Sequence, residues 1–332
     1  PSGLHGDSGA ILGNAVRADL TVTFVGLKAG LFLGDAPACT GDVAFAGLDI
    51  PADCRARIPV QMRRMDDSLL RATLPPRRRD AHKGDFGHLL LVGGGPGMSG
   101  AIRLAGIAAL RSGAGRVSIA THPSCAPTVA TGCAELMVHG IAEAGELAAL
   151  LKRVDTLAVG PGLGTDAWAH ALLLASLEAG LPCVLDADAL NLLHDVERRA
   201  KDWILTPHPG EAARLLGVAA SDVQKDRQQA LAALQERYGG TIVLKGANTL
   251  VSADGQPAWL CLAGNPGMAA PGMGDVLTGV IAGLLAQKLA PETAAVCGVL
   301  AHALAGDAAA AIGQRGMLAS DLLPELRAVL NP

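Results

Sequence analysis

Short apolar runs alternate with helical segments from His88 to the end of the chain, and this alternation limits the possible folds more than any other feature. The apolar runs lie in HLLLVGG, RVSIAT, DTLAVGPG, CVLDADALNLL, WILTPHPGE and TIVLKG, and between them segments such as SGAIRLAGIAALRSGAG have helical periodicity. This pattern indicates βαβ units and a mostly parallel sheet covered on both faces. We predict one α/β domain over residues 86–332, in which NTLVSADGQPAWLC forms a β-hairpin around a DG turn.

Residues 1–85 are less regular. Residues 1–52 contain two plausible strands, LTVTFVGL and DVAFAGLDI, and are too few to bury a core alone. We expect them either to pack on the rest of the chain or to be the end of a larger domain. For residues 53–85 we predict a linker, because Pro75 and Pro76 there precede a cluster of three arginines.

The composition argues against several functional classes. The formal net charge is −4 and no block of like charge is long, so we expect neither a nucleic-acid nor a membrane surface. We find no signal peptide and no apolar run of the roughly 18 residues that span a membrane. The seven cysteines lack close spacing, which is typical of a reducing compartment and predicts a cytoplasmic protein. Helices rich in small residues favour a homo-oligomer.

The loop GNPGMAAPGMGD, residues 264–275, precedes an apolar helical stretch and is the first candidate for a binding site. The backbone N–H groups of Gly272, Met273 and Gly274 could face a bound anion at the start of that helix, because glycine allows close approach. Asp275 follows in the first turn. It could take a proton from a hydroxyl group that attacks a bound phosphate, or it could be an ordinary helix N-cap.

Other strands end in polar residues, and ligands of open parallel sheets bind beyond such ends. Lys245 could contact a nucleotide or be a solvated lysine. His208, between two prolines, could be a positioned imidazole or a turn residue, and Glu211 opens the next helix. Asp186 and Asp188 could bind a cation or cap a helix. The sequence lacks GxxxxGK[ST], which excludes a Walker-type loop, and GGGPGMSG matches a dinucleotide-binding loop only loosely.

Seven segments occur in a characteristic order: HKGDFGHLLLVGG, MSGAIRLAGIAALRSGAG, VGPGLG, VLDADALNLL, LTPHPGE, LKGANTLV and NPGMAAPGMGDVLTGVIAGLLAQ. Together they resemble the ADP-dependent NAD(P)H-hydrate dehydratases of the ribokinase-like superfamily. The resemblance covers roughly residues 80 to 330 and implies a three-layer α/β/α fold with a mostly parallel central sheet. It also implies a repair reaction, in which hydrated NADH or NADPH (NADHX or NADPHX, S epimer) is dehydrated while ADP is split to AMP and phosphate. Mg²⁺ would bridge the ADP phosphates.

The resemblance also assigns roles to residues. Asp275 would be the catalytic base that deprotonates the ring hydroxyl, and an anion hole at Gly272, Met273 and Gly274 would steady the transferring phosphoryl group. The nucleotide would be bound by Lys245, Gly246, Ala247, Asn248, Thr249 and Gly274. The hydrated substrate would be bound by Ala101, Gly162, His208 and Asp275. Relatives often have Ser or Thr, then Gly or Ala, at the positions of Ala270 and Pro271; because proline lacks an N–H, the hole must rely on the later amides.

The first fifty residues resemble a second family. PSGLHGDSG and LTVTFVGLKAGLFLGDA look like the C-terminal end of an NAD(P)H-hydrate epimerase domain, which precedes the dehydratase in many bacterial bifunctional proteins. Ser2 matches a potassium-ligand serine of that family, so K⁺ would belong to a complete epimerase part. The aspartate expected just before PSG and a substrate loop expected far upstream are missing. We therefore expect this chain to be part of a longer protein and not to build an epimerase site.

Two other functions share these features. A ribokinase-like kinase for a sugar or vitamin alcohol would use the same GMGD base and anion hole, but would release a stable phosphorylated alcohol. A non-catalytic nucleotide sensor would keep the pocket without turnover, but such a sensor gains little from the carboxylate of Asp275 beside a phosphate. VGPGLG, TPHPGE and NPGM resemble the dehydratases more than the kinases.

Overall fold

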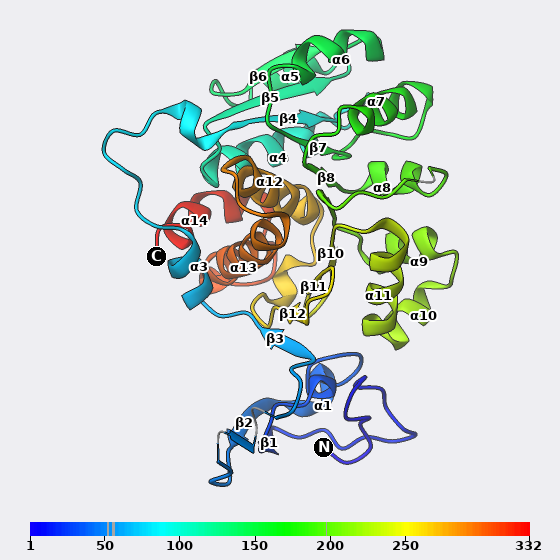
Figure 1. The fold of residues 1–332 in the computed structure, drawn as a ribbon, viewed down its shortest axis with the longest axis vertical. Helices are drawn as coiled ribbons and strands as arrows, with labels where there is room; N and C mark the ends of the chain where they lie inside the picture. The colour runs from blue at the N-terminus through cyan, green and yellow to red at the C-terminus, as the bar shows by residue number, and fades with distance from the viewer. Residues whose placement is uncertain (52, 55–56, 197) are drawn as a thin grey trace.

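The computed structural model describes residues 1–51, 53–54, 57–196 and 198–332. In this part of the chain, ten strands form one large sheet and two form a small sheet near the N-terminus (Figure 1). The strands are β1 (Leu20–Phe24), β2 (Asp42–Ala46), β3 (Met62–Arg64), β4 (His88–Val92), β5 (Arg116–Thr121), β6 (Met137–Gly140), β7 (Thr156–Val159), β8 (Cys183–Leu185), β9 (Trp203–Leu205), β10 (Thr241–Leu244), β11 (Leu250–Ala253) and β12 (Ala258–Leu260).

Helices fill most of the connections between these strands. The α-helices are α1 (Pro37–Thr40), α3 (Ser68–Thr73), α4 (Ser99–Arg111), α5 (Ala126–Ala130), α6 (Ala144–Leu151), α7 (Ala167–Glu178), α8 (Asp188–Leu193), α9 (Pro209–Leu216), α10 (Ala220–Lys225), α11 (Arg227–Tyr238), α12 (Met273–Ala286), α13 (Pro291–Ala309) and α14 (Leu322–Val329). Short 3₁₀ turns are η1 (Ala29–Leu31), η2 (Lys83–Phe86), η3 (Pro266–Met268), η4 (Ala310–Ile312) and η5 (Ala319–Asp321).

The large sheet has the strand order β3-β12-β11-β10-β9-β8-β7-β4-β5-β6. Among these strands, β11 alone runs antiparallel to its neighbours β10 and β12. The predicted mostly parallel sheet and the predicted hairpin are therefore confirmed. The chain moves from β4 outward through β5 to β6 and then returns to β7 on the other side of β4. The carboxyl ends of β4 and β7 thus form a topological switch point, the place where open α/β sheets bind ligands.

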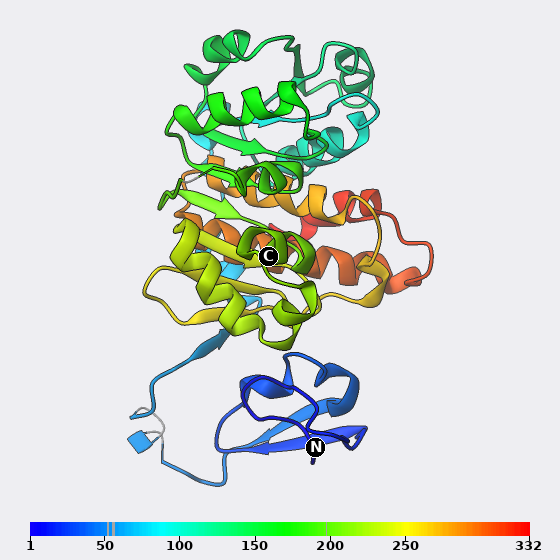
Figure 2. The ribbon, with the colours of Figure 1, turned by 90° about the vertical axis from the view of Figure 1, so that its right-hand side faces the viewer.

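Helices cover both faces of the sheet, and alternate residues of each strand enter different cores. Helices α4, α12, α13 and α14 lie on one face, and α6 to α9 and α11 lie on the other (Figures 1 and 2). In β4, Leu89 and Leu91 belong to the first core and Leu90 and Val92 to the second, and all four are fully buried. Since strand side chains alternate between faces, an uninterrupted apolar strand is what a sheet covered twice requires. The predicted three-layer α/β/α architecture is confirmed.

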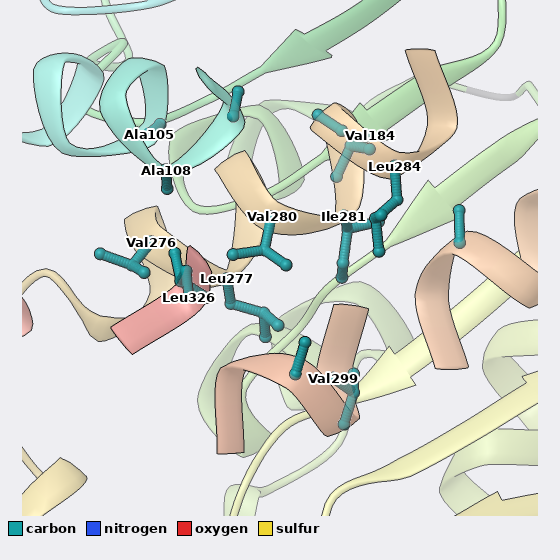
Figure 3. Packing of buried hydrophobic residues seen from close by; sticks show 14 of the residues in the cluster. Ala105, Ala108, Val184, Val276, Leu277, Val280, Ile281, Leu284, Val299 and Leu326 are labelled. Carbon is teal, nitrogen blue, oxygen red and sulfur yellow. The ribbon is translucent and has the colours of Figure 1, made fainter. Parts of the chain in front are cut away.

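Helix α12 lies at the centre of the first layer, beside α4 and α13. Figure 3 shows Val280 and Ile281 of α12 with Ala105 and Ala108 of α4 close by. A Cβ atom on Gly279 would come within 2.1 Å of the Ala105 carbonyl oxygen, so only glycine fits there. Small residues therefore let the two helices pack closely.

The segment predicted as a linker over residues 53–85 is partly integrated into the main domain. Strand β3 pairs in parallel with β12 at the edge of the large sheet. Met65 and Leu70 are buried in the first core. The structure therefore corrects the linker prediction for residues 62–73, because their apolar side chains complete this core. The proposed boundaries after residues 52 and 85 stay predictions.

The N-terminal segment forms a small sheet from the two predicted strand regions. Strands β1 and β2 pair in parallel. In β1, Thr21 and Thr23 are buried, whereas Leu20, Val22 and Phe24 are exposed. The apolar side of this strand therefore faces outward, the reverse of the usual arrangement.

Within the described residues, the stretch Pro291–Ile312 is long and apolar enough, by length and composition, to span a membrane. The stretch contains the polar residues His302 and Asp307. It comprises α13 and η4, and 61% of its apolar window is buried inside the protein. His302 is itself buried. The stretch is therefore explained as an interior helix of the first core.

Candidate active site

Two glycine loops meet at the switch point, after β4 and after β7. The amide of Gly95 donates to the carbonyl oxygen of Gly162 at 2.6 Å. Gly162 has a φ of +57°, and a Cβ there would lie 2.7 Å from Met98 Cβ and 3.2 Å from Ala101 Cβ. The structure therefore brings together Ala101 and Gly162, two of the four residues predicted to hold the hydrated nicotinamide. Only glycine lets these loops approach so closely.

A glycine also starts α12. Gly272 is the N-cap residue with a φ of +86°, and a Cβ there would meet Leu104 Cδ1 at 2.8 Å. No described side chain caps this helix. Asp275 is its third residue, so the alternative that Asp275 is an ordinary N-cap is wrong. The first-turn N–H groups of α12 are therefore available to an anion.

The carboxyl group of Asp275 is partly buried and easily protonated. Burial raises its pKa to about 7, with a further increase from Asp186 and Asp188, although Lys245 opposes the shift. A carboxyl group with a pKa near neutrality can both accept and release a proton under physiological conditions.

Asp186, at the end of β8, is the centre of a buried polar network beneath this turn. Its carboxylate accepts hydrogen bonds from Thr206 Oγ1 at 2.8 Å and Thr278 Oγ1 at 2.7 Å. It also forms an ion pair with Lys245 Nζ at 2.6 Å. The network ties the ends of β8, β9 and β10 to α12, and it fixes the surroundings of Asp275.

Lys245 lies inside this network and is not a solvated lysine. Its side chain is 17% exposed, and its Nζ lies 3.6 Å from Glu211 Oε2 as well as beside Asp186. Burial alone would lower the pKa of Lys245, but the two carboxylates raise it overall. A Cβ on Gly274 would lie 3.4 Å from Lys245 Nζ. The structure therefore places a buried positive charge directly beside the proposed anion hole.

His208 is the N-cap of α9 and uses its ring for that purpose. Its Nδ1 accepts hydrogen bonds from the amides of Gly210 at 2.9 Å and Glu211 at 3.3 Å, and Glu211 Oε2 accepts one from the His208 amide at 2.7 Å. The His208 side chain is 55% exposed. The structure thus supports the turn interpretation for Nδ1, and Nε2 lies 3.4 Å from Glu211 Oε1.

The segment predicted to bind the nucleotide, residues 245–249, follows β10. Two of its side chains already have partners within the protein: Thr249 Oγ1 donates to the Gly246 carbonyl at 3.0 Å, and Asn248 Nδ2 donates to the distant Phe32 carbonyl at 2.6 Å. Gly246 and Ala247 are exposed. The exposed backbone of this segment is therefore better placed than its side chains to contact a ligand.

The described residues contain no group of three or more His, Cys, Asp or Glu side chains that could hold a metal ion. Asp186 is committed to Lys245 and two threonines. Asp188 accepts from the Gly164 amide at 2.8 Å and from Asn191 Nδ2 at 3.3 Å. This donor set does not form a metal site by itself, but it agrees with an Mg²⁺ ion held mainly by phosphate oxygens and water.

Sequence reasoning missed three residues of the site. Thr206 and Thr278 fix Asp186, and Arg227 donates hydrogen bonds to four of the five carbonyl groups of residues 244–248. A threonine in an apolar strand or helix is usual, and Arg227 is followed in its helix by two further polar residues, both glutamine. Their partners are known only once the strands are placed side by side.

This fold and site define a ribokinase-like protein. A ribokinase-like superfamily protein of Enterococcus faecalis has a similar structure, with a TM-score of 0.75 and 30% identity, covering 82% of this chain and 96% of that one. An ADP/ATP-dependent NAD(P)H-hydrate dehydratase of Bacillus subtilis, co-crystallised with ATP and Mg²⁺, has a TM-score of 0.71 and 31% identity, covering 80% of this chain and 96% of that one.

Within the ribokinase-like proteins, the sequence comparisons identify one particular family. The model of the NAD(P)H-hydrate dehydratase family matches residues 89–327, and the chain belongs to that family. The bifunctional NAD(P)H-hydrate repair enzymes of Coxiella burnetii and Escherichia coli are 48% and 43% identical to it over 333 residues. Both matches cover all of this chain, but 68% and 64% of those relatives, so the chain spans about two thirds of their length. The prediction of an NAD(P)H-hydrate dehydratase, a lyase of metabolite repair, is confirmed, and the kinase alternative is not.

Proposed function

We propose that this chain dehydrates the S epimer of NADHX or NADPHX with ADP as co-substrate and Asp275 as the general base. The observation that supports this best is the state of Asp275, which lies at the start of α12, does not cap the helix and has its pKa raised to about 7. A base of this pKa suits proton abstraction from a weakly acidic hydroxyl group.

The proposed chemistry has two steps. Asp275 accepts the proton of the ring hydroxyl while the hydroxyl oxygen bonds to the terminal phosphorus of ADP, and AMP leaves with the electrons of the broken P–O bond. The ring carbon then releases phosphate with the electrons of the C–O bond, and loss of a neighbouring ring proton restores the double bond. The Gly272–Gly274 amides and the charge of Lys245 would stabilise the transferring phosphoryl group.

Substrate and nucleotide would bind on opposite sides of Asp275. Ala101 and Gly162 border the switch point, where the nicotinamide would lie, and His208 Nε2 would face the same ligand. Residues 245–249 and Gly274 would bind ADP. Mg²⁺ would neutralise phosphate charge. Asp188, whose partners are the Gly164 amide and Asn191, would be the carboxylate that contacts this ion or its bound water.

For residues 1–52 we propose only the end of an epimerase-like domain. Ser2 is exposed, and its carbonyl accepts from the Val16 amide at 3.1 Å. One such oxygen does not replace the hydration shell of K⁺, so the described residues do not fit that ion and we derive no step from it. We expect no conversion of the R epimer by this chain with K⁺ present; measurable conversion would contradict that. A homo-oligomer and a cytoplasmic location also stay predictions.

The test of the main proposal is an assay with hydrated NADH and either ADP or ATP, which follows reduced nicotinamide and free phosphate together. We expect equal appearance of both products with ADP. A stable phosphorylated product without free phosphate would support kinase chemistry instead. Tight ADP binding with no product would support the sensor, and the proposal would be wrong.

A further inference from the structure

We propose that Arg227 is a positioning residue of the nucleotide site, whose guanidinium group holds residues 244–248 in the shape that binds ADP. Arg227 Nη1 donates to the carbonyl oxygens of Ala247 at 2.6 Å and Asn248 at 3.1 Å. Arg227 Nη2 donates to those of Leu244 at 3.0 Å and Lys245 at 3.3 Å. One side chain therefore contacts four of the five carbonyls in this segment. The inference rests on the proposed function, which assigns ADP to this segment.

The buried position of Arg227 is unfavourable for a charged group unless these hydrogen bonds stabilise it. The residue is only 6% exposed, and burial lowers the pKa of its guanidinium to about 10. It is also the first residue of α11, where the helix dipole disfavours a positive charge. Among the described residues no carboxylate forms an ion pair with it. The backbone carbonyls are thus the groups that stabilise this buried charge.

The segment needs such support because its backbone is unusual. Gly246 has a φ of +141° and Asn248 a φ of +57°, in the region that side chains rarely adopt. A Cβ on Gly246 would lie 3.2 Å from Arg227 Nη2, so the guanidinium packs directly on this glycine. The hydrogen bonds of Arg227 reach carbonyl groups on both sides of Gly246 and so connect the two halves of the turn.

The arrangement also has an electrostatic consequence for a nucleotide. Carbonyl oxygens carry negative partial charge and repel the anionic phosphates of ADP. By drawing four of them toward one buried cation, Arg227 keeps them away from a ligand bound at this segment. A planar guanidinium with its forked donors can serve four acceptors, whereas the compact ammonium of lysine has three donors on one atom. The contacts therefore require arginine specifically.

The experiment compares Arg227→Met and Arg227→Lys with Arg237→Met in the complete chain. Arg237 lies on the same helix, but it donates to the Leu215 carbonyl and does not contact the nucleotide segment. For each variant, kcat, the KM for ADP and the KM for hydrated NADH are measured. Hydrogen exchange of the amides of residues 244–249 is followed with and without ADP, and thermal unfolding reports stability.

We expect Arg227→Met to raise the KM for ADP at least about tenfold, which corresponds to ~1.4 kcal/mol. The kcat at saturating ADP and the KM for hydrated NADH should change by less than about threefold. Arg227→Lys should lie between Arg227→Met and the wild type, and Arg237→Met should leave the KM for ADP unchanged. Amide exchange at residues 244–249 should speed up in the Arg227 variants only.

A folded Arg227→Met protein with the wild-type KM for ADP would overturn the inference. If that variant does not fold, Arg227→Lys decides: a wild-type KM and wild-type amide exchange would mean that Arg227 has only a structural role. The wild type separates the two proposals. If ADP does not protect residues 244–249 there, the assignment of ADP to this segment fails; if ADP protects them and the variants bind it normally, only the role of Arg227 fails.

Discussion

At the scale of single residues, Asp275 combines a position that exposes its carboxylate to a ligand with surroundings that favour its protonated form. Burial is the main cause that raises the pKa of Asp275; the nearby Asp186 raises it further, while Lys245 lowers it. Because both charges modify the effect of burial, changes at Asp186 or Lys245 should alter the pH at which the enzyme works.

The first prediction concerns Asp275→Asn. The amide cannot accept the hydroxyl proton, so we expect turnover of hydrated NADH to fall by about 10²–10⁴-fold. Binding of ADP, measured by calorimetry, should be nearly unchanged. Asp254→Asn is the matched control, because Asp254 is exposed beside the β11–β12 turn. Full turnover in the Asp275 variant would remove the assignment of the base.

The second prediction concerns pH. A base must be deprotonated to act, and the pKa of Asp275 is raised to about 7. The value of kcat/KM should therefore fall with decreasing pH below about 7, by tenfold per pH unit, and level off above it. A pH profile between pH 5 and 9 measures this. A plateau that continues down to pH 5 would show that the group in the free enzyme ionises near the ordinary carboxyl value.

Sequence alone selected Asp275 and the glycines before it as candidates, because GMGD at the start of an apolar helix is a local pattern. It could not identify Arg227, whose partners are backbone carbonyls and leave no trace in residue type. It also left Lys245 open between a solvated and a binding role, because the carboxylates beside it come from β8 and α9. Such contacts depend on which strands become neighbours.

At the scale of secondary structure, the position of α12 depends on its close packing against α4. Strands β4, β5, β7, β8, β9 and β10 were predictable because a strand buried on both faces is largely apolar. Strand β6 was not predicted, because its residues are only partly buried. Strand β3 was not, because Met-Arg-Arg at an edge has no such pattern and is defined only by its partner β12. The third prediction tests the contact of α12 with α4.

Gly279→Ala should destabilise the protein by about 1–3 kcal/mol, since its new methyl group would overlap the Ala105 carbonyl and force the helices apart. Gly145→Ala in α6 is the control, because no atom lies within 4 Å of a Cβ there; it should be neutral or stabilising by up to about 1 kcal/mol. Urea unfolding measures both. Equal stabilities of the two variants would contradict the packing argument.

At the scale of the whole molecule, residues 62–73 belong to the main domain although they lie in front of it in the chain. The fourth prediction follows from their burial. Leu70 is 1% exposed, so Leu70→Ala should cost about 2–5 kcal/mol of unfolding free energy. Val60, which is 60% exposed, lies in the same predicted linker, and Val60→Ala should cost less than about 0.5 kcal/mol. If chemical denaturation showed equally small losses of unfolding free energy for both variants, the linker interpretation would be correct after all.

The contact between Asn248 and the Phe32 carbonyl has a consequence for modularity. Phe32 lies outside residues 89–327, which match the dehydratase family, yet it supports the segment proposed to bind ADP. The segment proposed to bind ADP thus has a contact outside the residues that match the family. If residues 89–327 were moved alone into another protein, Asn248 would lose the Phe32 carbonyl as its acceptor. A fusion design should therefore provide another carbonyl group at that position.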